Sequence, residues 1–243
     1  MASSGLSQCG CGKVTLRWRD PTPHLMLECC CCDCRQAHEF EAAQGGPPML
    51  SPVSELLYFK NENITLDAAQ NQDVTKYVRS VQLREGARST RLVTTCCHSI
   101  LAVDHPAYMG NLFMVPIGSQ GKLEYSEVEH DDGTCFPTPA MRIYLADWDT
   151  VCDGPAPEPM LDPNPALWHG MAPGDIRGVF ASCRACGCRE APNGEHIPMD
   201  GAMYEAGATL QEIFQALGPP TILGLVERER FRPGSLVQRT VCG

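Results

Sequence analysis

A short cysteine-rich run carries the strongest chemical signal in the sequence. Within residues 28–35, Cys29, Cys31 and Cys34 form a C-x-C-x-x-C frame. Alternate residues of an extended segment project to the same side, and a two-residue turn brings the third sulfur back, so three thiolates can converge on one ion. We expect the ion to be zinc, which prefers tetrahedral coordination by thiolates or imidazoles.

The number of ligands decides what such a site does. A zinc ion with three protein ligands keeps a fourth position for water or substrate, whereas a structural site normally fills all four positions with protein. The spacing leaves two interpretations open. Cys29, Cys31 and Cys34 either hold an open zinc ion, or they form a structural knuckle that takes a fourth ligand from elsewhere in the chain.

Two more cysteine pairs predict a second metal site. Cys9 and Cys11 form a C-x-C, with a glycine after each cysteine, directly before a predicted strand. Cys96 and Cys97 are adjacent at the end of another predicted strand, where a disulfide between neighbours would be strained. The four sulfurs together predict a closed structural zinc site that ties the first strand to the middle of a sheet and contributes folding energy.

The remaining clustered cysteines have weaker interpretations. Cys183, Cys186 and Cys188 form the reversed spacing C-x-x-C-x-C and are candidates for an extra metal site. Cys30 and Cys32 are surplus to the metal frame. They would suit thiol redox sensing if they were exposed and had low pKa values.

The composition limits the class of protein. At 243 residues with 43% hydrophobic residues, the chain can bury a sizeable core. A formal net charge of −10 disfavours nucleic-acid binding, which needs a basic surface. We find no apolar run long enough to span a membrane and no signal-peptide pattern at the start. We therefore expect an intracellular, cytoplasmic protein whose 15 cysteines stay reduced and bind metal.

Alternating polar and apolar residues predict a mainly β domain. Val14, Leu16 and Trp18 show the period-2 pattern of a half-buried strand. Further strands are predicted at 56–59, 64–66, 77–83, 90–95, 100–103, 112–115 and 141–148. A short helix is predicted over 35–43, with the positive end of its dipole toward the three thiolates. His38 on this helix is either a proton-transfer group near the metal or a surface residue.

The sequence divides into three regions. Residues 5–150 form the zinc-binding β domain, and six prolines between 155 and 173 predict a linker without regular structure over 151–174. Residues 175–243 form a C-terminal extension. In it, a capping box at 209–212 and the breaker Gly-Pro-Pro at 218–220 bound an amphipathic helix, which we expect to pack against the domain or a protein partner.

In order, the cysteine motifs resemble those of the glutathione-dependent formaldehyde-activating enzyme and centromere protein V family. Residues 9–12 correspond to its opening C-x-C-G, and residues 29–35 to its C-H-C-x-x-C-R, with Cys30 in place of the histidine. Residues 97–101 fall where the family has C-G-T-P-L. The family's later C-x-x-C would begin at Thr94, so either Cys96 replaces the missing ligand or the site has three sulfurs. This variant resembles an uncharacterised side branch of the family, and the resemblance covers residues 7–117.

The resemblance implies an Mss4-like fold of small antiparallel sheets pinned by zinc, with one closed and one open metal site. In the founding enzymes the open site is tied to adding glutathione to formaldehyde, a carbon–sulfur lyase class reaction. Cys29, Cys31 and Cys34 would then hold the catalytic zinc, and Arg35 is the candidate to bind a carboxylate of glutathione. The alternative is a non-catalytic zinc-stabilised module whose C-terminal extension binds a protein partner.

Overall fold

The computed structural model describes residues 4–48, 53–108, 110–126, 141–143, 166–167 and 207–225, and this part of the chain is mainly β, as predicted. The elements in chain order are β1 Gly5–Gln8, β2 Val14–Trp18, β3 Leu25–Cys29, α1 Cys32–Ala43, β4 Ser54–Lys60, β5 Thr65–Ala68, the 3-10 turns η1 Ala69–Asn71 and η2 Val74–Lys76, β6 Val78–Gln82, β7 Thr90–Thr94, β8 Ile100–Asp104, η3 Pro106–Tyr108, β9 Leu112–Pro116, β10 Lys122–Glu124, β11 Met141–Ile143, β12 Ala166–Leu167, α4 Leu210–Leu217 and β13 Thr221–Ile222.

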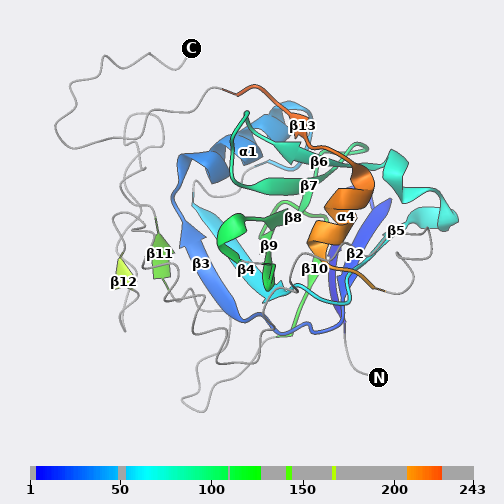
Figure 1. Ribbon diagram of the computed structural model, residues 1–243, viewed down its shortest axis with the longest axis horizontal. Helices are drawn as coiled ribbons and strands as arrows, with labels where there is room; N and C mark the ends of the chain where they lie inside the picture. The colour runs from blue at the N-terminus through cyan, green and yellow to red at the C-terminus, as the bar shows by residue number, and fades with distance from the viewer. Residues whose placement is uncertain are drawn as a thin grey trace.

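The strands form two sheets rather than several small ones (Figure 1). One has four strands in the order β10-β1-β2-β5, and the other has nine in the order β12-β11-β3-β4-β9-β8-β7-β6-β13. The larger sheet is also not purely antiparallel, because β11 pairs in parallel with β3 and β12, and β13 pairs in parallel with β6. The expectation of small antiparallel sheets is therefore too simple. The parallel pairs all involve strands that return to the sheet edges from late in the chain.

The nine-stranded sheet carries buried residues on both of its faces. Along β4, Leu57 and Phe59 join one hydrophobic core, while Leu56 and Tyr58 join another. Successive strand residues point to opposite faces, so these two cores lie on opposite sides of the sheet. We call the core with Leu57 and Phe59 the first core and the core with Leu56 and Tyr58 the second core.

The first core lies between the two sheets. Trp18 of β2 packs on Phe59 of β4 and Phe113 of β9, with ring centroids 4.6 Å and 5.4 Å away. Aromatic pairs at such separations add to the stabilisation from burial. The predicted alternation of β2 is confirmed, since Val14, Leu16 and Trp18 are almost fully buried.

Helix α4, orange in Figure 1, packs on the first core. Its capping box is present as predicted, with Thr209 and Glu212 exchanging side-chain and backbone hydrogen bonds. Leu210 and Ile213 are fully buried, and the Leu210 N–H donates to Asn61 Oδ1 at 2.7 Å. The apolar face of this helix therefore belongs to the domain and is already covered.

Part of the predicted linker has regular structure. Ala166 and Leu167 form β12 and pair in parallel with β11, so the expectation of no strand over 151–174 is wrong at this point. The predicted strand over 141–148 is described only at 141–143. In the described parts of the chain, none of the helices has the length and apolar character needed to cross a membrane.

Candidate metal centres

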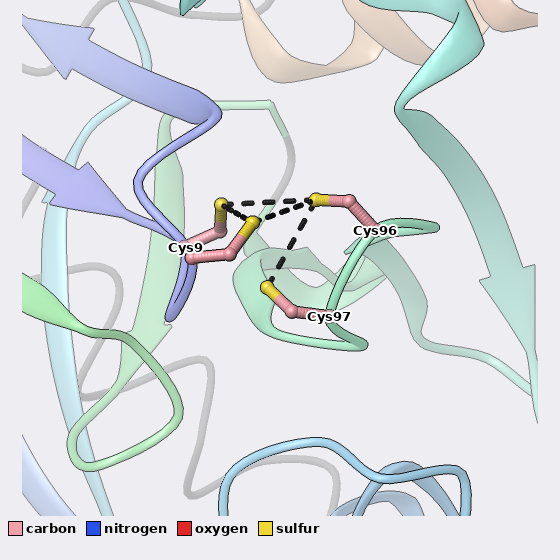
Figure 2. A group of neighbouring side chains, drawn as sticks. Cys9, Cys96 and Cys97 are labelled. Atoms are coloured by element: carbon pink, nitrogen blue, oxygen red, sulfur yellow. Dashed lines mark hydrogen bonds between the residues drawn. The ribbon is translucent and has the colours of Figure 1, made fainter.

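Four sulfur atoms converge where the β1–β2 turn meets the turn after β7. Figure 2 shows Cys9 facing Cys96 and Cys97 across this junction, and the sulfur of Cys11 belongs to the same group. All four sulfurs lie within 4.8 Å of one another. We call this group the four-sulfur centre, and it contains the residues predicted for the closed site.

The sulfur separations fit a single zinc ion. Cys11 Sγ lies 3.6 Å from Cys9 Sγ and 3.3 Å from Cys96 Sγ, and Cys96 Sγ lies 3.9 Å from the sulfurs of Cys9 and Cys97. Thiolates at about 2.3 Å from a tetrahedral zinc ion are about 3.8 Å apart. The four thiolates of Cys9, Cys11, Cys96 and Cys97 would therefore hold zinc with little rearrangement.

The β1–β2 turn is folded around the Cys9 sulfur. The N–H of Cys9 donates to the Val14 carbonyl at 3.0 Å, and the N–H of Gly12 donates to the Cys9 carbonyl at 2.9 Å. Gly12 has a φ of +76°, which glycine adopts without steric strain. The N–H of Val14 then points at Cys9 Sγ at 3.3 Å, and such a donor stabilises a thiolate.

Thr94 and Ser99 support the Cys97 sulfur from the other turn. Their hydroxyl oxygens lie 3.6 Å and 3.5 Å from Cys97 Sγ. Partial burial raises the pKa of Cys97, but these hydrogen bonds outweigh it and lower that pKa to about 6. Ser99 Oγ also accepts from the N–H of Gly10 at 3.0 Å, which joins the two turns. Thr94, at the position where the resembled family has a cysteine, thus supports a ligand here.

Three further sulfurs form a separate group on the other face of the large sheet. Cys29, Cys31 and Cys34 have their sulfurs within 4.8 Å of one another, as the C-x-C-x-x-C spacing predicts. Cys29 is buried in the second core, and the half-buried Cys31 and Cys34 pack against that core. We call this group the three-sulfur centre. Among the described residues no fourth cysteine, histidine or carboxylate belongs to it.

Helix α1 begins inside the three-sulfur centre. We predicted its start after Cys34, but it starts at Cys32, with Cys31 as the N-cap. The thiol of Cys31 takes the place of the usual Ser or Asp oxygen, because its Sγ accepts from the N–H of Cys34 at 3.3 Å. Two of the three sulfurs therefore lie at the N-terminal end of a helix, where the helix dipole favours negative charge.

The thiols of the three-sulfur centre have very different pKa values. Hydrogen bonds from Cys29 and Cys31, assisted by the positive charge of Arg91, hold the pKa of Cys34 well below its usual range. The hydrogen bonds of Cys29 to Cys31 and Cys34, together with burial, raise the pKa of Cys29 well above that range. The group thus concentrates negative charge at the first turn of α1 before any ion binds.

His38 and Arg35, the residues considered for proton transfer and substrate binding, have different surroundings from those expected. His38 is half-buried rather than a surface residue, and burial, with help from Arg91, lowers its pKa to about 4. Its imidazole is therefore neutral at pH 7. Arg35 is 2% exposed, and its Nη1 donates to the Cys30 carbonyl, so its buried side chain stabilises the backbone of residues 29–34. A role for Arg35 in substrate binding stays a prediction.

Sequence reasoning missed Arg91 on β7. It is 4% exposed, and its Nη2 donates to the carbonyl of Asp33, the residue between Cys32 and Cys34, at 3.3 Å. In the sequence Thr90-Arg91-Leu92-Val93 it looks like the solvent-facing residue of a half-buried strand. The sequence gives only a weak signal for this role, because Arg91 is buried by contact with α1, which is distant in the sequence.

The other cysteine candidates are only partly described. Cys30 and Cys32 are buried, at 0% and 4% exposed, which does not fit exposed redox-sensing thiols. All the described cysteines are free thiols. Cys183, Cys186 and Cys188 lie outside the described residues.

The fold and the two sulfur groups define the class: a mainly β protein whose two cysteine centres could each hold a metal ion. No protein-family model, curated protein or solved structure matches the chain.

Proposed function

We propose that the protein binds zinc at both centres, with a structural ion in the four-sulfur centre and a reactive ion in the three-sulfur centre. The open fourth position would bind a small thiol or its aldehyde adduct. The function would then resemble that of carbon–sulfur lyases acting on glutathione–aldehyde adducts, such as S-(hydroxymethyl)glutathione synthases.

The observation that carries this proposal is the difference in ligand number. The first group contains four sulfurs at tetrahedral separations, whereas the second contains three, with no fourth ligand among the described residues. Zinc with three protein ligands characteristically binds water or substrate in its fourth position. Cys31 and Cys34 are half-buried rather than enclosed, which is compatible with access for a small molecule.

The residues of the three-sulfur centre suit an anionic sulfur ligand or a polarised oxygen. A zinc ion there would act as a Lewis acid and would keep a bound thiol deprotonated. The first turn of α1 and the buried Arg91 place positive potential beside the sulfurs. His38 is neutral at pH 7 and lies four residues after Cys34 on the same helix, so it would be the candidate to exchange a proton with a bound adduct.

A structural role is the second candidate for the three-sulfur centre. The thiol of Cys31 caps α1, so an ion at this position would also anchor that helix. In that case protein ligands would saturate the ion, and it would not exchange a ligand with thiols. The two roles differ in one measurable property, the exchange of the fourth ligand.

The test is zinc stoichiometry followed by thiol titration. Elemental analysis of the wild type should give two zinc ions, and the Cys31→Ser, Cys34→Ser variant should fold and keep one. After replacement of zinc by Co²⁺, glutathione should shift the thiolate-to-cobalt absorption of the wild type and leave the variant unchanged. Cys30→Ser, which alters a buried cysteine of the same run outside the centre, is the matched control.

The catalytic part needs its own measurement. Exchange between formaldehyde and its glutathione adduct, followed by NMR, should be faster with the wild type than with the double variant. One zinc ion in the wild type, or a cobalt spectrum indifferent to glutathione, would refute the open site. Thiol binding without faster exchange would leave a thiol-binding protein that is not a lyase.

A further inference from the structure

Arg91 is a buried cation without a carboxylate partner in the described parts of the chain. Only 4% of its surface is exposed, and its guanidinium donates to two main-chain carbonyls, those of Ser89 at 3.4 Å and Asp33 at 3.3 Å. A buried charge is strongly unfavourable unless it is paired. Two neutral carbonyls satisfy hydrogen bonds of Arg91 but leave its charge uncompensated.

The carboxylates nearest in the fold can balance only part of this charge. The side chain of Asp33 pairs with Arg84, although its carbonyl receives the Arg91 hydrogen bond. Glu41 of α1 lies within electrostatic reach of both Arg79 and Arg91, but burial raises its pKa to about 7, so near neutral pH it is only partly charged and is shared between two arginines. Most of the Arg91 charge therefore needs another anion.

The three-sulfur centre lies in the right place to be that anion. The hydrogen bond from Arg91 ends on Asp33 in the first turn of α1, one residue before Cys34 and two after Cys31. A divalent ion held by three thiolates carries one net negative charge, which equals the single positive charge of the guanidinium.

We propose that Arg91 is the built-in counter-ion of a three-thiolate metal centre and that it sets the charge state in which this centre holds its ion. This inference rests on the proposed binding of a metal by Cys29, Cys31 and Cys34, but not on any catalytic activity. Arg91 acts through the thiolates and is a positioning residue. The resting fourth ligand is then neutral, and the deprotonated thiol of the proposed function would add one negative charge that Arg91 does not balance.

The four-sulfur centre shows why only one centre needs such a residue. A divalent ion with four thiolates carries two net negative charges, yet Cys11 is exposed and Cys96 and Cys97 are half-buried, so water can screen them. In the three-sulfur centre Cys29 is buried and Cys31 and Cys34 are half-buried, so none of its residues is as exposed as Cys11. Water therefore screens its charge less, and the protein has to balance more of it.

The test compares Arg91→Met with Arg79→Met in the full-length chain. Arg79 of β6 lies near Glu41 at the C-terminal end of the same helix, whereas Arg91 donates to Asp33 in its first turn. Competition with a chromogenic chelator should show the second zinc ion bound at least tenfold more weakly in Arg91→Met, as expected when a residue supporting a metal ligand is lost. The first ion should be unaffected, Arg79→Met should stay within about threefold of wild type, and Arg91→Lys should retain most of the affinity.

The same substitutions in the Cys31→Ser, Cys34→Ser background separate charge balance from a general structural role. Without the second ion Arg91 has nothing to neutralise, so Arg91→Met should lower the urea midpoint there by less than half of its effect in the zinc-loaded wild type. An equal loss in both backgrounds, or failure to fold in both, would make Arg91 an ordinary structural residue and overturn the assignment. Equal weakening of the second ion by Arg91→Met and Arg79→Met would also overturn it.

The outcomes distinguish this inference from the proposed function. A single zinc ion in the wild type refutes the open site itself. Two ions with an Arg91→Met variant that binds both normally refutes the counter-ion assignment alone. Two ions, a weakened second ion in Arg91→Met and no exchange of formaldehyde support Arg91 as counter-ion of a centre that is not a lyase.

Discussion

The two sulfur centres use the same ligand type in different settings. The four-sulfur centre joins two turns that are far apart in the sequence, and neighbouring N–H and O–H groups from Val14, Thr94 and Ser99 surround its sulfurs. The three-sulfur centre is built from one short segment at the start of α1 and has a buried arginine beside it. The four-sulfur centre brings together two distant parts of the chain, whereas the three-sulfur centre is formed within one segment that the rest of the fold supports.

This difference indicates that the free energy of metal binding would have a different effect at each centre. An ion in the four-sulfur centre would link the four-stranded sheet, through Cys9 and Cys11, to the nine-stranded sheet, through Cys96 and Cys97, so its binding energy would contribute to folding. An ion in the three-sulfur centre would orient one helix. Its binding energy remains free to discriminate among ligands in the fourth position.

The largest expected effect is loss of one ligand from the four-sulfur centre. Cys97→Ser should lower the free energy of unfolding by more than about 4 kcal/mol, because loss of a structural metal is among the most destabilising changes. Cys34→Ser should have less than half that effect. Urea denaturation followed by circular dichroism measures both. Equal losses in the two variants would mean that both centres are structural and would remove the contrast.

A smaller effect is expected where the two regions touch. A Cβ at Gly46 would lie 2.7 Å from the carbonyl oxygens of both Glu41 and His98, so the end of α1 is packed tightly against the turn that carries Cys97. Gly46→Ala should lower the free energy of unfolding by about 1–3 kcal/mol, the usual cost of overpacking.

Gly10→Ala is the matched control for this junction. Its Cβ would lie 3.6 Å from Ser99 Oγ, which is an ordinary contact, so its effect on the free energy of unfolding should be within about 0.5 kcal/mol. If thermal or urea unfolding shows Gly46→Ala to be as stable as Gly10→Ala, α1 and the turn are not tightly coupled.

The smallest expected effect concerns the pH dependence of stability. It distinguishes the titration of the buried Asp104 from the loss of metal in acid. Burial raises the pKa of Asp104 to about 6, and Gln211 of α4 donates to its carboxyl at 2.9 Å. The folded state therefore binds this proton more tightly than the unfolded state, so the Asp104 contribution to stability falls as pH rises from about 4 to 6. Protonation of metal-binding thiolates has the opposite sign, because it destabilises the protein as pH falls.

Asp104→Asn keeps an oxygen to accept from Gln211 and removes the buried charge. It should raise the free energy of unfolding at pH 7 by up to about 2 kcal/mol, with little change at pH 4. Urea midpoints measured across this pH range provide the check. A stability gain that is the same at pH 4 and pH 7 would show that the charge of Asp104 is not the cause.

The sequence was sufficient for the parts of the fold governed by local pattern. The alternation of β2, the capping box of α4 and the grouping of the cysteines into two sets all depend on spacing, and all are confirmed. The start of α1 was predicted too late because cysteine is not a usual N-cap residue, so only the folded geometry shows the Cys31 sulfur in that role.

Arg91 and the size of the large sheet depend on distant parts of the chain. A strand arginine is normally solvent-exposed, and only the covering α1 makes Arg91 a buried charge. Likewise, the parallel pairing of β11, β12 and β13 could not be read from the sequence, and β12 and β13, with two residues each, give too little periodic signal to be recognised as strands. The family resemblance stays a prediction.

The position of α4 in the chain has a consequence for how the protein folds. Asn61 and Gln211, which hydrogen-bond to each other, are 150 residues apart in sequence, and α4 completes the first core around Trp18. Contacts of such long sequence separation slow folding, because the loop must close before the contact forms. During synthesis the first core stays uncovered until residue 217 has left the ribosome, which makes this interval the period of greatest exposure to aggregation and to chaperone binding.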